Sequence, residues 1–200
     1  MRIIGITGGV GSGKSRVLSF MEEQYGAVIC QADQVAWKLQ EPGQACYEKI
    51  VSHFGTGILR EDKTIDRGTL GGIVFGNTEE MAVLNRIVHP EVKRYIRNLI
   101  QEEEKAGTEY FILEAALLLE DHYDEICDEL WYIYTKETVR RMRLKESRGY
   151  SDEKISAIMG SQMPEHVFRE RCQVTIDNSE AFEKTEKEIE KAMNRQEKIR

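Results

Sequence analysis

Long apolar runs are missing from this chain of 200 residues. Its longest stretches without Asp, Glu, Lys or Arg are residues 3–13 and 68–78, eleven residues each. A helix needs about 20 consecutive apolar residues to cross a bilayer, so we expect no transmembrane helix. Only Arg2 precedes the first apolar run, and no small-residue cleavage pattern follows that run. We therefore expect no signal peptide and a cytoplasmic protein.

An excess of positive charge is also missing, because 28 Lys and Arg face 35 Asp and Glu, for a net charge of −7. A general nucleic-acid or membrane-surface binder carries a broad basic field, so neither partner is expected. An anionic small molecule remains compatible with this balance, because a site can gather a few cations locally.

Cysteine and proline are scarce. The four cysteines, Cys30, Cys46, Cys127 and Cys172, form no C-x-x-C pair and no metal-ligand pattern with the four histidines. Scattered cysteines of this kind are typical of small core residues in a reducing compartment, so no disulfide or zinc site is expected. The three prolines, Pro42, Pro90 and Pro164, are each expected to interrupt a helical segment.

Short β-rich runs alternate with helical patterns along the chain. The expected strands are Arg2–Thr7, Ala27–Cys30, Tyr110–Leu113, Leu130–Tyr134 and Gln173–Ile176. Several are apolar without strict alternation, as strands buried on both faces are. This alternation predicts an α/β domain with a mostly parallel sheet.

Two segments depart from a regular strand–helix repeat. About eighty residues, from Gln31 to Glu109, separate the second expected strand from the third, far more than a βαβ crossover needs. We interpret this segment as a helical insertion that binds substrate. Part of it has an apolar face formed by Ile87, Val88, Val92, Tyr95, Ile96, Leu99 and Ile100. The second segment, Arg140–Arg171, begins with many basic residues, and a charged helix is expected over Ser179–Arg200.

The clearest motif lies between the first strand and the helix that follows it. The residues expected to bind a nucleoside triphosphate are Gly8, Gly9, Val10, Gly11, Ser12, Gly13, Lys14, Ser15 and Arg16. The first eight of them match G-x-x-x-x-G-K-[ST], a loop whose backbone N–H groups surround phosphate at a helix N-terminus. We expect Lys14 to contact the β- and γ-phosphates and Ser15 to ligate Mg²⁺.

Asp33 follows the second strand, at the sheet edge where ligands gather. It is placed to orient an attacking hydroxyl and accept its proton. Capping a helix over Gln34–Leu39 would explain an aspartate there equally well, and one residue can do both.

A basic cluster follows the fourth strand. Its members are Arg140, Arg141, Arg143, Lys145 and Arg148. A lid whose arginines close over the transferring phosphoryl group would explain the cluster, and so would a solvated helix face. No strand ends in an obvious magnesium-binding aspartate, since Phe111–Leu113 ends in Glu114. No Asn-Lys-x-Asp element is present, which disfavours a GTPase switch.

Taken in order, these motifs resemble the dephospho-coenzyme A kinase family. The matching segments are the loop from Thr7 to Ser15, Gln31-Ala32-Asp33, Glu41-Pro42-Gly43, His89-Pro90, Leu117 to Glu120, Arg148, Gln162-Met163 and Ile176-Asp177-Asn178. Arg16, Gln31, Ala116 and Ile158 depart from the family's pattern.

The resemblance implies ATP-dependent, Mg²⁺-assisted phosphorylation of the ribose 3′-hydroxyl of dephospho-coenzyme A. It implies a three-layer P-loop kinase fold with a five-stranded parallel sheet, a helical substrate-binding insertion and a lid. The corresponding boundaries are a core of 1–35, 108–139 and 172–200, an insertion of 36–107 and a lid of 140–171.

The resemblance also implies roles for single residues. Lys14, Asp33, Arg140 and Arg148 are the expected catalytic residues, and His89, Lys93 and Arg94 join Asp33 as candidate acceptor contacts. A histidine before proline at a helix start could equally be a cap or a packed side chain. Another small-molecule or nucleotide kinase of the same fold, or a nucleotide-dependent switch, are the alternatives, and a monomer is expected.

Overall fold

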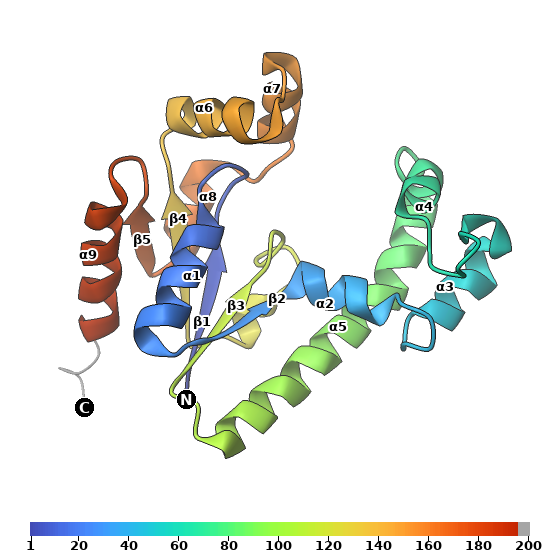
Figure 1. Ribbon diagram of the computed structural model, residues 1–200, viewed down its shortest axis with the longest axis horizontal. Coiled ribbons are helices and arrows are strands. Elements are labelled where there is room, and N and C mark those ends of the chain that lie inside the picture. The colour runs from blue at the N-terminus through green and yellow to red at the C-terminus, as the bar shows by residue number, and fades with distance from the viewer. Residues whose placement is uncertain (196–200) are drawn as a thin grey trace. The chain divides into compact units, whose positions relative to one another are not determined.

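All five expected strands are present in the computed structural model, which describes residues 1–195 (Figure 1). They are β1 (Arg2–Thr7), β2 (Val28–Gln31), β3 (Tyr110–Glu114), β4 (Glu129–Tyr134) and β5 (Val174–Asp177), so each expected boundary is confirmed to within one residue. They form one parallel sheet in the order β2-β3-β1-β4-β5. The α/β prediction is confirmed.

The register places β1 at the centre of the sheet. It pairs with β3 through Ile6 and Glu114 on one side and with β4 through Ile6 and Trp131 on the other. The strand order therefore reverses at β1, and in open parallel sheets ligands bind at the carboxyl end of the strands at such a point. The loop after β1 occupies that position.

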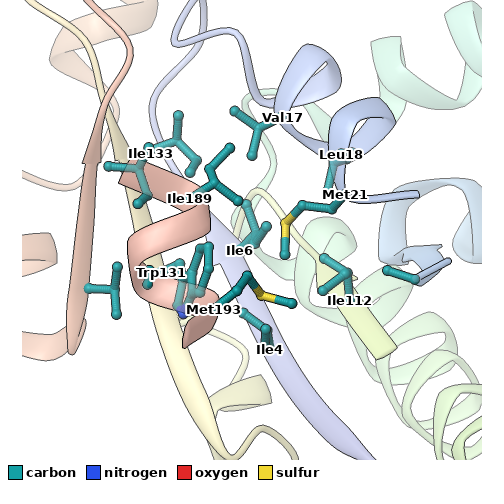
Figure 2. Close-up of a cluster of buried hydrophobic side chains, with 14 of the residues drawn as sticks. Ile4, Ile6, Val17, Leu18, Met21, Ile112, Trp131, Ile133, Ile189 and Met193 are labelled. Atoms are coloured by element: carbon teal, nitrogen blue, oxygen red, sulfur yellow. The ribbon is translucent and has the colours of Figure 1, made fainter. Parts of the chain in front are cut away.

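The core on one face of the sheet lies beneath α1 (Lys14–Tyr25) and α9 (Phe182–Met193). Figure 2 shows Met193 of α9 beside Trp131 of β4, in one cluster with Ile189 of α9 and Val17 and Met21 of α1. All five are buried, and this apolar burial holds the two helices against the sheet. Residues 196–200 of the helix expected over Ser179–Arg200 lie outside the described part of the chain.

The opposite face of the sheet packs against α8 (Glu165–Arg171). The rings of Phe168 in α8 and Tyr132 in β4 stack, with centroids 4.9 Å apart and planes 7° from parallel. Between β4 and α8 come α6 (Glu137–Arg148) and α7 (Asp152–Gly160). None of the helices within residues 1–195 is long and apolar enough to cross a membrane.

The chain forms two compact units. The first combines residues 1–29 with the chain from residue 107 onward, and the second is residues 30–106. The expected insertion, 36–107, overlaps the second unit over residues 36–106. The expected lid, 140–171, lies within the first unit and takes in most of α6 together with α7 and α8.

The second unit is helical. It contains α2 (Ala32–Leu39), α3 (Tyr47–Phe54), the short η1 (Thr56–Ile58), α4 (Arg67–Val74) and α5 (Thr78–Ala106). The long helix α5 packs against α2, α3 and α4 and buries Val88, Val92 and Ile96 from the apolar face predicted by the sequence.

The expectation that Pro90 interrupts a helix is wrong. Pro90 lies inside α5, which continues for sixteen further residues to Ala106. Proline removes one N–H donor from the helix ladder, and the buried residues Val88, Val92 and Ile96 on both sides of it stabilise the continuous helix. His89 is consequently not at a helix start, so the capping explanation of this residue is excluded. Pro42 and Pro164 lie outside helices, as expected.

Candidate active site

The loop between β1 and α1 curls because two of its glycines adopt left-handed backbone conformations. Gly11 has φ +78° and Gly13 has φ +85°. Gly13 also admits no side chain for a second reason, because a Cβ there would lie 2.4 Å from Nδ2 of Asn178. Among residues 1–195, the N–H groups of Gly11 and Gly13 have no hydrogen-bond acceptor. Both donors remain available to an anion at the N-terminus of α1.

The carbonyl of Ser12 is fixed by three donors from distant parts of the chain. It accepts hydrogen bonds from Oγ1 of Thr135 at 2.9 Å, Nδ2 of Asn178 at 2.8 Å and Nη1 of Arg143 at 3.3 Å. In a trans peptide the C=O and the following N–H point in opposite directions. Holding this carbonyl therefore aims the N–H of Gly13 away from the three donors, into the curve of the loop.

A buried chain of hydrogen bonds supports this arrangement. Oγ1 of Thr185 in α9 donates to Oδ1 of Asn178 at 3.0 Å, and Asn178 then donates to Ser12. Thr135, Asn178 and Thr185 are all buried, so each depends on its protein partners for hydrogen bonding. In the sequence, Asn178 belongs to the Ile176-Asp177-Asn178 segment that resembles the family, but nothing in that segment indicates what Asn178 does.

An earlier carbonyl of the loop, that of Val10, is held by the basic helix α6. Nε of Arg140 donates to the Val10 carbonyl at 2.8 Å, and its Nη2 donates to Oε1 of Gln162 at 2.7 Å. The same Gln162 oxygen accepts from the Val10 N–H at 3.2 Å. The guanidinium lies close to Gly9, where a Cβ would be 2.3 Å from Nη2. Val10 is thus held at both its N–H and its C=O.

Arg140 and Arg143 form no ion pair within 4 Å among the described residues. Their hydrogen-bond acceptors are all neutral oxygens, which for Arg143 include the Asn178 carbonyl at 2.9 Å. Desolvation lowers the pKa of both guanidinium groups, and repulsion from Arg16 adds to the effect at Arg143. Within residues 1–195, two partly buried guanidinium groups with no carboxylate within 4 Å are suited to binding an anion.

The other lid arginine that was expected to be catalytic behaves differently. Arg148 is exposed at the end of α6, and its guanidinium lies 5.8 Å from the ring centre of Tyr150. Arg16, expected among the nucleotide-binding residues, lies 3.9 Å from the ring centre of Phe182. The catalytic role of Arg148 and the nucleotide contact of Arg16 stay predictions.

Lys14 folds back over the loop that it follows. Its Nζ donates to the Gly8 carbonyl at 2.7 Å and lies 3.7 Å from Oε1 of Glu114. Glu114 is buried at the carboxyl end of β3, next to β1. Glu114 was not among the expected site residues, because an aspartate was expected at a strand end that binds magnesium. The available signal was a carboxylate directly after the buried run Phe111–Leu113.

Asp33 lies in the first turn of α2, in the helical unit, and its side chain is exposed. The helix begins at Ala32 with Gln31 at the N-cap position. The expectation that Asp33 caps a helix starting at Gln34 is therefore wrong. Its carboxylate has no hydrogen bond or ion pair among residues 1–195.

His89, Lys93 and Arg94 are brought together by the helical repeat of α5. They line a hollow of about 540 Å³ with Pro90, Arg97, Asn98 and Gln101, of which sequence reasoning missed the last three. Nε of Arg94 donates to Glu91 at 3.0 Å, and Nζ of Lys49 lies 2.9 Å from the same carboxylate. Both cations lower the pKa of Glu91.

A second hollow in the helical unit was not expected from the sequence. It measures about 350 Å³ and is lined in part by Trp37, Gln40, Arg60 and Arg67. Trp37 is 49% exposed, and the guanidinium of Arg67 lies 4.5 Å from its ring centre. Trp37 follows Asp33 by four residues and so lies on the same face of α2.

The sheet and the anion-binding loop define a P-loop kinase. A family model described as dephospho-CoA kinase matches residues 2–184, and the chain belongs to that family. It is 41% identical to the dephospho-CoA kinase of Carboxydothermus hydrogenoformans over 187 residues, 94% of this chain and 90% of that one. It is 38% identical to that of Halalkalibacterium halodurans, covering 94% and 92%. The chain is therefore a kinase enzyme whose family uses ATP as phosphoryl donor.

Solved structures agree with this assignment. A protein of Thermus thermophilus superposes with a TM-score of 0.80 at 26% identity, covering 96% of each chain. The dephospho-CoA kinase from Campylobacter jejuni gives 0.71 at 25% identity, again covering 96% of each. A shikimate kinase from Acinetobacter baumannii, at 0.54 and 12% identity, shares the fold alone. The predicted family and the P-loop kinase fold are confirmed.

Proposed function

We propose that this chain transfers the γ-phosphoryl group of ATP to the ribose 3′-hydroxyl of dephospho-coenzyme A, producing coenzyme A and ADP. Family membership supports this reaction. The observation that carries it comes from the described residues 1–195. There the loop has two N–H groups without an acceptor, and two guanidinium groups beside it have no ion pair with a carboxylate, a combination suited to a triphosphate.

The loop and α6 provide the electrostatic part of the reaction. Lys14 neutralises the phosphates, and Arg140 stabilises charge on the equatorial oxygens of the transferring group. We assign Arg148 the same expected role when the 140–171 segment closes as a lid. The N–H groups of Gly11 and Gly13 orient the triphosphate before the transfer.

Asp33 is the proposed general base. Its exposed, unpaired carboxylate supports this role, because it is free to accept a hydrogen bond from the 3′-hydroxyl of the acceptor. The helical unit would bind the rest of the acceptor through His89, Lys93 and Arg94. The basic hollow on α5 fits the diphosphate of that substrate in sign of charge.

Mg²⁺ would be held by the Ser15 hydroxyl together with phosphate oxygens and water. Ser15 is exposed in the first turn of α1, open to such an ion. Within residues 1–195 no group of three or more His, Cys, Asp or Glu side chains is arranged to hold a metal ion, which fits an ion bound mainly by the nucleotide. Bound there, the ion would neutralise charge on the β- and γ-phosphates. We also propose a cytoplasmic monomer.

A coupled assay of ADP release tests the proposal, with dephospho-coenzyme A, AMP, UMP and shikimate as competing acceptors. ADP release that depends on dephospho-coenzyme A is expected, with product of coenzyme A mass. Turnover confined to another acceptor would identify a different kinase of this fold. Slow hydrolysis that ignores every acceptor would indicate a nucleotide-dependent switch.

A further inference from the structure

Gln162 lies in the turn between α7 and α8 and forms the link between Arg140 and the phosphate loop. Its Oε1 accepts two hydrogen bonds at once, from Nη2 of Arg140 at 2.7 Å and from the N–H of Val10 at 3.2 Å. Arg140 in turn donates to the Val10 carbonyl at 2.8 Å. The three residues close a ring of hydrogen bonds that joins three separate segments of the first unit.

The hydrogen bond from Arg140 to Gln162 is the strongest and most important in this ring. A guanidinium donor makes a shorter and stronger hydrogen bond than a neutral one, and 2.7 Å is at the short end of that range. Arg140 has no carboxylate partner among the described residues, so only two neutral oxygens fix its direction. Without Gln162 a single bond from Nε would remain, and the guanidinium plane could rotate about it.

An acidic residue at position 162 would hold Arg140 more tightly, but it would cancel the charge that the triphosphate needs. The amide oxygen of Gln162 directs the guanidinium and leaves its charge available. The same oxygen holds the N–H of Val10, so the carbonyl of Val10 stays turned toward Arg140.

We propose that Gln162 is a positioning residue for phosphoryl transfer, which acts through Arg140. It sets the guanidinium of Arg140 against the phosphate loop and makes the α7–α8 turn part of the nucleotide site. This inference rests on the proposed function only in that the loop binds ATP. It adds a residue outside the loop and the helix α6 to the set that governs ATP binding and transfer.

A double-mutant cycle tests the proposal. Gln162→Met keeps the length of the side chain and removes the acceptor, while Arg140→Ala removes the group on which Gln162 acts. In the full chain, Gln162→Met is expected to lower kcat about tenfold and to weaken ATP binding about fivefold, the scale of a displaced catalytic group. In the Arg140→Ala background the same change is expected to alter either quantity less than about twofold.

The control is Ser161→Ala, on the neighbouring exposed residue, whose hydroxyl donates to the Ile158 carbonyl and not to the loop. It is expected to leave kcat, ATP binding and melting temperature unchanged. Gln162→Glu keeps an acceptor for both donors, so it is expected to restore the melting temperature of any less stable Gln162→Met protein. Its added negative charge is expected to weaken ATP binding relative to the wild type.

Two results would overturn the proposal. One is an equal loss from Gln162→Met with and without Arg140, and the other is no loss in the wild-type background. ATP binding is measured by isothermal titration without an acceptor, so this arm does not depend on which acceptor the enzyme uses. If the wild type binds ATP but does not phosphorylate dephospho-coenzyme A, the proposed function fails, while the dependence of ATP binding on Gln162 still decides this inference.

Discussion

Two arginines at the phosphate loop and two in the helical unit are held in different ways. In the helical unit, Arg94 is paired with Glu91, and Arg60 lies 3.1 Å from Asp66. At the phosphate loop, the hydrogen-bond acceptors of Arg140 and Arg143 within residues 1–195 are backbone carbonyls and a side-chain amide oxygen. A carboxylate fixes a cation and cancels its charge, whereas a neutral oxygen fixes the cation and leaves the charge in place.

This difference explains how a protein of net charge −7 offers a site for a polyanion. The strength of such a site depends on a few cations whose charge is not cancelled nearby, rather than on the total charge. Partial burial reinforces the effect at Arg140 and Arg143, because water screens their charges less. The comparison predicts that substitutions at the loop reduce catalysis far more than matched substitutions in the helical unit.

Replacement of Lys14 should have the largest effect. Lys14→Ala removes the cation that strengthens its phosphate contacts in the transition state, so kcat is expected to fall about 10³-fold or more. Steady-state kinetics with ATP and dephospho-coenzyme A measures it. The control is Lys145→Ala, because exposed Lys145 pairs with Asp152 at 2.8 Å, away from the loop. Similar losses in both variants would contradict a specific role for Lys14.

Asp33 is expected to be an exception in the helical unit. Its substitution should strongly reduce catalysis, because Asp33 acts on the acceptor. Asp33→Asn is expected to lower kcat by about 10²–10⁴-fold, the range for loss of a general base, with ATP binding kept. The control is Glu48→Gln, an exposed carboxylate in the first turn of α3. A nearly normal kcat for Asp33→Asn would leave Asp33 without a catalytic role.

Arg140→Ala and Arg94→Ala compare the two kinds of arginine directly. Loss of Arg140 is expected to lower kcat about 10²-fold, as when one preorganised donor is removed. Loss of Arg94 is expected to raise KM for dephospho-coenzyme A less than about tenfold with kcat kept, because Glu91 already neutralises much of its charge. Equal effects on kcat would show that the carboxylate partner makes no difference.

Gly13→Ala tests the shape of the loop. A side chain at φ +85° is strained, and its Cβ would lie 2.4 Å from Asn178, so the free energy of unfolding is expected to drop by about 1–3 kcal/mol. Gly43→Ala is the control, because it has φ +81° with no atom near the added Cβ. Denaturant unfolding should show a larger loss for Gly13→Ala, and ATP binding should weaken only there.

The smallest effect concerns pH and Glu91. Lys49 and Arg94 lower the pKa of the Glu91 carboxyl in the folded protein. The ionised carboxylate therefore stabilises the fold fully at pH values above its unfolded pKa of about 4.3. This contribution is lost as the pH falls through the lower pKa of the folded state. Glu91→Gln is expected to cost less than about 1 kcal/mol at pH 7 and to make stability less dependent on pH below about 4.3. An unchanged pH dependence would argue against the Glu91 pairs.

The strands were predictable because parallel strands buried on both faces leave short apolar runs such as Phe111–Leu113. The phosphate loop was predictable because its glycines and Lys14 are consecutive. Pro90 was misjudged because the packing of Val88 and Val92 outweighs the local preference of proline. The possible N-cap role of Asp33 was misjudged because α2 starts at Ala32, two residues before the expected start at Gln34.

The hydrogen bonds around the loop were beyond sequence reasoning. Thr135 and Asn178 are 123 and 166 residues away from Ser12 along the chain, and neither residue type indicates a carbonyl as its partner. The basic cluster of α6 was visible, but its spacing did not distinguish Arg140, which contacts the loop, from Arg148, which does not. Only the packing of α6 against the loop makes that distinction.

The buried bonds from Thr185 to Asn178 and from Asn178 to Ser12 have a consequence for the order of folding. Asn178, between β5 and α9, and Thr185, in α9, are far along the chain from the loop that they shape. Contacts between residues so distant in sequence require closure of a long loop, and this closure costs conformational entropy. We therefore expect the phosphate loop to reach its final shape only after α9 has docked on the sheet.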